Sequence, residues 1–67
     1  MKIQPQVLKA ARVFNQDSQE DVARSIGCCV RSVRNWERGR KPMGVYREAL
    51  WAYLHDTAER IREDHAN

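Results

Sequence analysis

The chain has 67 residues, 42% of them hydrophobic and 31% charged, and a formal net charge of +3. This hydrophobic share suffices for one compact core and excludes a disordered chain, while the length allows a single domain over residues 1–67. No apolar run is long enough to span a membrane and the N-terminus lacks an apolar signal core, so we expect a cytoplasmic protein with no membrane partner.

The charge is unevenly distributed along the chain. Residues 1–47 contain ten Lys and Arg against four acids, whereas residues 48–67 contain two Arg against five acids. The basic residues are densest between positions 31 and 47, where Glu37 is the only acid. A localised basic surface is typical of a protein that binds a polyanion, although a solvated charged face gives the same pattern.

Helical periodicity runs through nearly the whole chain, and no stretch alternates like a strand, so we expect an all-α fold. The first helix should begin near Pro5, which suits the first helical position, and end at residues 15–17. The apolar positions expected on its buried face are Val7, Leu8, Ala10, Ala11 and Phe14.

A second, short helix should open at Ser18, whose side chain can cap it, with Asp21 completing a weak capping box. Its expected inner face is Val22, Ala23 and Ile26. Gly27 should end this helix, because glycine tolerates the left-handed conformation that a sharp turn needs.

A third helix follows after only Cys28 and Cys29 and should run from about Val30 to Arg38, ending at Gly39. Only Val33 and Trp36 are apolar anchors on it, so its other faces are polar. Residues 39–42 form a basic loop that cannot continue a helix because it contains a proline.

The last helix should start near Gly44 or Val45. Its expected core positions are Tyr46, Ala49, Leu50 and Tyr53. Beyond residue 54, either Asp56 caps a fresh helix or the helix continues to about Asp64, and the continuing apolar phase favours continuity.

A second apolar seam on this helix is rotated away from the first and consists of Trp51, Leu54, Ala58 and Ile61. A second seam is typical of a helix that pairs with another helix. We therefore expect a two-fold homodimer through a helical extension at residues 50–64, the alternative being that the seam packs back on the first helix.

The stretches SQEDVA (18–23), IG (26–27) and SVRNWERGRKP (32–42) resemble the Cro/C1-type helix-turn-helix domains of phage repressors and bacterial regulators, over roughly residues 7–54. The resemblance implies a four- to five-helix, lambda-repressor-like domain with its core in residues 4–54 and its helix-turn-helix in helices 2 and 3. It also implies a sequence-specific regulator that binds double-stranded DNA. We expect a homodimeric autorepressor of a phage or bacterial operon that reads a palindromic operator.

The resemblance implies that the third helix reads DNA. Within this helix Arg31 can donate two hydrogen bonds to guanine, and Arg34 lies on the same side as the second candidate. The residues predicted to contact bases are Val30, Arg31, Ser32, Arg34 and Asn35. Those predicted to contact phosphates are Ser18, Gln19, Cys29, Arg38, Arg40 and Lys41. Cysteine is a poor N-cap residue, so Cys29 should hold the start of the third helix less firmly than Ser or Thr would.

The resemblance further implies that Gln19 binds a phosphate and that Arg12 and Glu37 form a structural ion pair, the alternative being Arg12 on a phosphate. The two cysteines have no metal-ligand spacing to His55 or His65, so we expect no metal. With no nucleophile–base pair, we expect no enzymatic activity, cofactor or small-molecule ligand. The alternative function is an antitoxin-type protein that binds a partner protein through its C-terminal helix as well as DNA.

Overall fold

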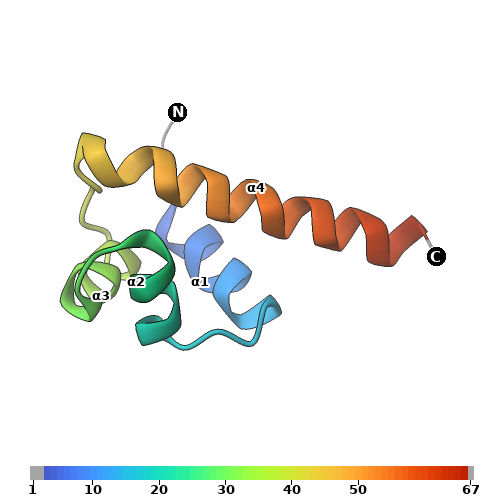
Figure 1. Cartoon of the computed structure of the whole chain (residues 1–67), viewed down its shortest axis with the longest axis horizontal. Helices are drawn as coiled ribbons and strands as arrows, with labels where there is room; N and C mark the ends of the chain where they lie inside the picture. Colours follow the sequence, from blue (N-terminus) through green and yellow to red (C-terminus); the bar gives the residue numbers. More distant parts are fainter. Residues whose placement is uncertain (1–2, 67) are drawn as a thin grey trace.

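The computed structural model describes the backbone of residues 3–66 and the side chains of residues 3–64, and its regular structure is entirely helical (Figure 1). Its four helices are α1 (Pro5–Phe14), α2 (Gln19–Ile26), α3 (Val30–Glu37) and α4 (Gly44–Ala66). The predicted all-α class is therefore confirmed for this part of the chain. A separate fifth helix is absent from residues 3–66, because the C-terminal segment belongs to one continuous α4 of 23 residues.

The helix boundaries follow from local chemistry at the positions that the sequence indicates. Pro5 stands at the start of α1, where its missing N–H costs no hydrogen bond. The Ser18 hydroxyl accepts from the Asp21 N–H and the Asp21 carboxylate accepts from the Ser18 N–H, which completes the capping box of α2. Gly27 ends α2 with φ +88°, and Gly39 follows α3 with φ +114°.

The core lies where the four helices meet. Its fully buried side chains include Leu8 of α1, Val22 of α2, Val33 of α3 and Leu50 of α4, so every helix contributes at least one anchor. Burying one such side chain stabilises the fold by about 1.5–3 kcal/mol. The remaining buried hydrophobic residues are Ala11, Ala23, Trp36 and Leu54.

The predicted buried face of α1 is only partly correct. Leu8 and Ala11 are buried, but Val7 is 49% exposed and Phe14 42% exposed, and Ala10 is exposed as well. The physical reason is that α1 packs against α3 and α4 on one side only, so a narrow stripe suffices to cover the core. The rest of the apolar surface of α1 faces outward.

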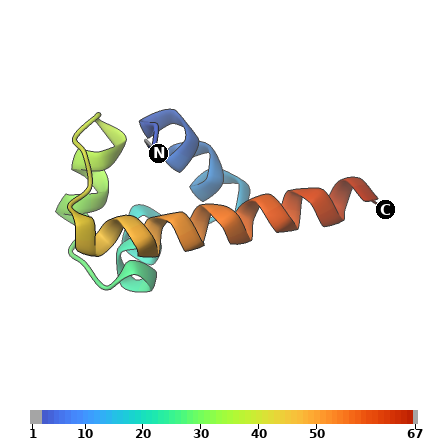
Figure 2. The same cartoon turned by 90° about the horizontal axis from the view of Figure 1, so that it is seen from above.

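The four helices form an elongated body of 36 × 24 × 19 Å. Both views show α4 running along the whole length of the body, with α2 and α3 near its beginning and its C-terminal part extending beyond the other helices (Figures 1 and 2). Asp56 lies inside α4 and does not cap a separate helix, so the expected continuity of the last helix is confirmed. Within residues 3–66, no helix combines the length and apolar character needed to cross a membrane.

Candidate functional site

Helices α2 and α3 are joined by a three-residue turn, residues 27–29, and we call residues 19–37 the α2–α3 unit. The N–H groups of Gly27 and Cys28 both donate to the Ala23 carbonyl, at 2.8 and 2.9 Å, which closes the end of α2 tightly. Ala23 and Val33 are buried where the two helices cross. The buried contacts between α2 and α3 thus hold the unit together, and the opposite side of α3 is free to contact other molecules.

The exposed side of α3 is basic. Arg31 and Arg34, three residues apart and therefore on neighbouring positions of the helix, are both exposed. Val30, Ser32 and Asn35 are half-buried at the edges of this surface. Of the five residues predicted to contact bases, the two arginines are therefore the most accessible.

The basic surface continues past the end of α3. The N–H of Arg40 donates to the Asn35 carbonyl at 2.9 Å, which folds the loop back against the last turn of α3. The predicted phosphate contacts that are exposed in the structure are Ser18, Cys29, Arg38, Arg40 and Lys41. The Ser18 hydroxyl already accepts a hydrogen bond from the Asp21 N–H at the start of α2, so the position of this side chain is fixed.

The acid nearest to this basic surface is neutralised by an ion pair, and the predicted pair of Arg12 and Glu37 is present. Arg12 donates from Nε to Glu37 Oε2 at 2.7 Å and from Nη2 to Oε1 at 3.1 Å. The two side chains are only 16% and 7% exposed. This geometry commits Arg12 to Glu37, which argues against the alternative that Arg12 contacts a phosphate.

Gln19, the other residue that the resemblance singles out, joins the same pair. Its Nε2 donates to Glu37 Oε1 at 3.2 Å, so one amide hydrogen points inward. Burial opposes the ionisation of Glu37, but the hydrogen bonds from Arg12 and Gln19 outweigh it and hold the pKa of Glu37 below its ordinary value. Glu37 is therefore an ionised, paired carboxylate that fixes α1, α2 and α3 to one another.

The two cysteines occupy different environments at the start of α3. Cys29 is the N-cap but makes no side-chain cap bond to the helix, as expected of a poor cap. Its Sγ lies 3.5 Å from Ser32 Oγ, and this contact together with nearby backbone groups lowers the pKa of the Cys29 thiol. Burial raises the pKa of the Cys28 thiol. Cys29 is exposed and Cys28 is half-buried, so we expect Cys29 to react faster with thiol reagents.

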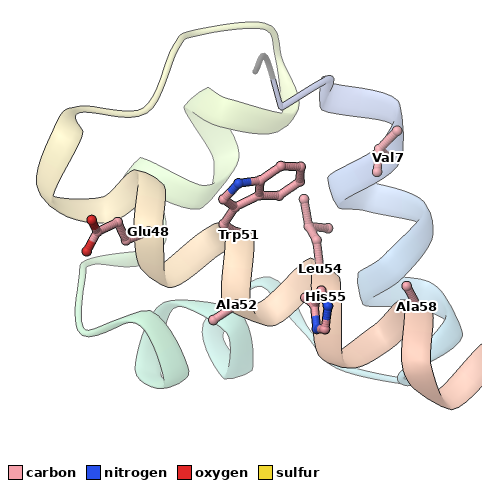
Figure 3. Close-up of a pocket in the computed structure, with 7 residues that line it drawn as sticks. All are labelled: Val7, Glu48, Trp51, Ala52, Leu54, His55 and Ala58. Atoms are coloured by element: carbon pink, nitrogen blue, oxygen red, sulfur yellow. The ribbon is translucent and has the colours of Figure 1, made fainter.

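A second surface is apolar and lies along α1 and α4. On α4, Trp51 is 43% exposed and Ile61 37% exposed, on the same side as Ala58. A hollow of about 570 Å³ lies between the two helices, and Figure 3 shows Trp51 and Leu54 pointing from α4 toward α1, where Val7 lies.

The apolar surface continues over the outside of α1. A hollow of about 240 Å³ shares Val7 and Ala58 with the first, and one of about 540 Å³ shares Ala10 with the second. We call this continuous surface the α1–α4 face. Its exposed apolar members are Val7, Ala10, Val13, Phe14, Trp51, Ala58 and Ile61.

The predicted seam on α4 is correct in part. Trp51, Ala58 and Ile61 are exposed, but Leu54 is 8% exposed and belongs to the core, so the prediction that it projects outward is wrong. Leu54 packs back toward α1, which is the alternative that the sequence left open. Sequence reasoning missed the α1 half of the face, although apolar residues at 7, 8, 10, 11, 13 and 14 cover more of a helix than one buried stripe needs.

Comparisons of the chain with protein-family models, with curated proteins and with solved structures found no match. The geometry and electrostatics of the α2–α3 unit and of the α1–α4 face are therefore the observations from which a function can be inferred.

Proposed function

We propose that the chain is a sequence-specific transcriptional regulator, in which α2 and α3 act as a helix-turn-helix of the Cro/C1 type that binds double-stranded DNA. One observation carries the proposal: α3 is anchored by Val33 and Trp36 and presents Arg31 and Arg34 on its free side. Between residues 22 and 47 the only acid is Glu37, and Arg12 neutralises it. A short, rigidly held helix with a basic outer side suits the major groove.

The residues around α3 suggest how DNA is bound. Arg31 and Arg34 can each donate two hydrogen bonds to guanine O6 and N7, which discriminates against a wrong base by about 1–3 kcal/mol per pair. Gln19 has a second amide hydrogen that can donate to a phosphate while the first holds Glu37. Arg38, Arg40 and Lys41 can bind phosphates on the flank of the groove, which positions α3 without reading sequence.

We further propose that two copies associate through their α1–α4 faces and bind an inverted repeat. Trp51 and Ile61 are still 43% and 37% exposed, so each can contribute part of the about 1.5–3 kcal/mol that full burial of such a side chain provides. Association therefore needs several residues of the face together. The charges give weaker support, because Arg12 is already paired with Glu37 and leaves Lys9 as the base of α1 that can meet the five acids and three Arg of α4 in the other copy. A regulator of this kind can repress by occupying a promoter.

Selection of bound duplexes from a random double-stranded DNA pool tests this function. We expect the wild-type chain to select an inverted repeat with guanine in each half-site, the half-sites lying about 34–36 Å apart. Arg31→Ala should weaken binding to the selected site and relax the base preference at one position per half-site. The matched control is Arg62→Ala, which removes the same charge from the exposed end of α4. Absence of any enriched sequence, or unchanged preference in Arg31→Ala, contradicts the proposal.

A further inference from the structure

A cluster of hydrogen bonds joins the connection between α1 and α2 to the middle of α4. Tyr53 Oη donates to Asp17 Oδ2 at 2.7 Å, and Asn15 Nδ2 donates to Thr57 Oγ1 at 2.7 Å. Thr57 is only 2% exposed and donates in turn to the Tyr53 carbonyl at 3.0 Å. Burial and the bond to Asp17 raise the pKa of Tyr53 to about 12, so its hydroxyl remains a donor at neutral pH. We call these four residues the clasp.

The clasp lies in the second half of α4, just before the last contacts of that helix with the body, where Arg60 Nη1 donates to Asn15 Oδ1 at 3.2 Å and Ile61 lies beside α1. Thr57 is the last buried residue of α4 among those whose side chains are described, and α4 continues from there to Ala66 (Figure 2). At about 1.5 Å per residue this extension measures roughly 14 Å. A small rotation of α4 about the clasp therefore displaces the C-terminal end of the helix more than the residues beside the clasp.

The same residues are connected to the end of α3. Arg12 Nη1 donates to the Asp17 carbonyl at 3.2 Å while its other nitrogens hold Glu37, the last residue of α3. Asp17 therefore accepts a hydrogen bond from Tyr53 of α4 at its carboxylate and one from Arg12 of α1 at its carbonyl. Because Arg12 also holds Glu37, Asp17 links α4 to the end of α3 through a short chain of hydrogen bonds.

Hydrogen bonds add direction to the apolar contacts that anchor α4. Leu50 and Leu54 are packed in the core, and Tyr46 of α4 contacts Trp36 of α3 at a ring-centroid distance of 5.8 Å. The clasp consists of directional hydrogen bonds at an edge of the core. The Thr57 hydroxyl is buried, and a buried hydroxyl without a hydrogen-bond partner would be costly. The clasp thus selects one angle of α4.

We propose that Tyr53 and Thr57 are positioning residues that determine the half-site spacing this protein accepts. The inference rests on the proposed function, in which the α1–α4 face pairs two copies and α3 reads each half-site. The angle between α4 and α3 then determines how far apart the two α3 helices stand. Each base pair added between the half-sites moves the second half-site by about 3.4 Å along the DNA and rotates it around the helix axis. A dimer with a fixed angle between α4 and α3 therefore fits one half-site spacing.

The experiment uses the full chain and the half-site obtained by selection. Duplexes carry the inverted repeat with spacers lengthened or shortened by single base pairs, and one further duplex carries a single half-site. The variants are Tyr53→Phe, Thr57→Val and the double variant, which remove hydroxyls and little volume. Thr57→Ser restores the hydroxyl, and Tyr46→Phe removes a hydroxyl from α4 outside the clasp. Circular dichroism and sedimentation check that each variant is folded and associates as the wild-type chain does.

We expect the wild-type chain, Thr57→Ser and Tyr46→Phe to prefer one spacer sharply. The double variant should bind the single half-site as the wild type does, yet lose about tenfold of its discrimination between the best spacer and its neighbours. A double variant that retains the wild-type spacer profile overturns the inference and leaves DNA binding intact. If the double variant unfolds, Tyr53→Phe alone decides, with the same two outcomes. A wild-type chain that binds no duplex instead refutes the proposed function.

Discussion

Helix α3 and the α1–α4 face are two outward surfaces of the molecule, and they differ in chemistry. On α3 the outward side chains are arginines, and the neighbouring acid is sequestered by Arg12. On the α1–α4 face the outward side chains are mainly Trp, Ile, Val and Phe, with Glu48 and His55 beside the hollow between α4 and Val7. The first surface suits a polyanion and the second suits another apolar surface, so one small core can serve two partners.

The two tryptophans provide the strongest test of this difference, because Trp36 is 6% exposed and Trp51 is 43% exposed. We expect Trp36→Ala to lower the free energy of unfolding by about 3–5 kcal/mol, since it leaves a cavity beneath α3. Trp51→Ala should cost less than about 1 kcal/mol at protein concentrations where the chain is monomeric. Urea denaturation followed by circular dichroism measures both values. Equal losses in the two variants would contradict the separation of core and face.

Glu37→Gln separates the structural acid from the basic surface around it. Breaking the buried pair should cost about 3 kcal/mol at pH 7, because Arg12 is left with an unpaired charge. The folded pKa of Glu37 is lowered, so its contribution is present above the ordinary pKa of a glutamate and disappears as the pH falls through the lower folded value. A series of urea titrations at decreasing pH, starting from pH 7, should therefore show a difference between the variant and the wild type that shrinks as the pH falls. A difference that grows on acidification would reverse the sign and refute the ion pair as the cause.

Substitution on the α1–α4 face sharpens the other half of the comparison. Trp51→Ser should raise the dissociation constant of the homodimer by at least about tenfold, because the apolar contribution of one large side chain is lost. Val45→Ser is the matched control, since Val45 is 83% exposed on α4 and lies outside the α1–α4 face. Sedimentation over a concentration series measures both. A wild-type chain that stays monomeric at high micromolar concentration would leave this face to a different protein, the antitoxin-type alternative.

The smallest expected effect concerns the two cysteines beside α3. At neutral pH iodoacetamide should alkylate Cys29 faster than Cys28, because the Ser32 contact lowers the pKa of Cys29 and burial raises that of Cys28. Single Cys28→Ser and Cys29→Ser variants, followed by mass spectrometry, separate the two rates. Adding the selected duplex should slow alkylation in Cys28→Ser, whereas an unrelated duplex should not. Unchanged rates with the selected duplex would place Cys29 outside the interface.

The features that could be predicted from the sequence are those set by neighbouring residues. Pro5, Ser18 and Gly27 define helix ends through their own backbone and side-chain chemistry, so these boundaries were recognisable. The accessible arginines of α3 could likewise be predicted, because Val33 and Trp36 fix which side of a short helix faces the core.

The features that were missed depend on residues far apart in the chain. The bond between Asn15 and Thr57 spans 42 positions, and neither side chain has a pattern that signals it. The exposure of Val7 and Phe14 was also missed, because a period of apolar residues does not tell how many neighbours cover a helix. Leu54 was predicted to face outward for the same reason, because the sequence shows two apolar seams on α4 but not which side chains pack against α1.

In the proposed complex, α3 and its flanks contact DNA while the α1–α4 face does not. Nuclear magnetic resonance distinguishes the two surfaces in one experiment, a titration of the 15N-labelled chain with a duplex that carries one selected half-site. We expect saturable shift changes at the start of α2, along α3 and through residues 38–41, with residues 7, 13, 14, 51 and 61 little affected. Changes concentrated on the α1–α4 face, or none that saturate, would contradict the proposed complex.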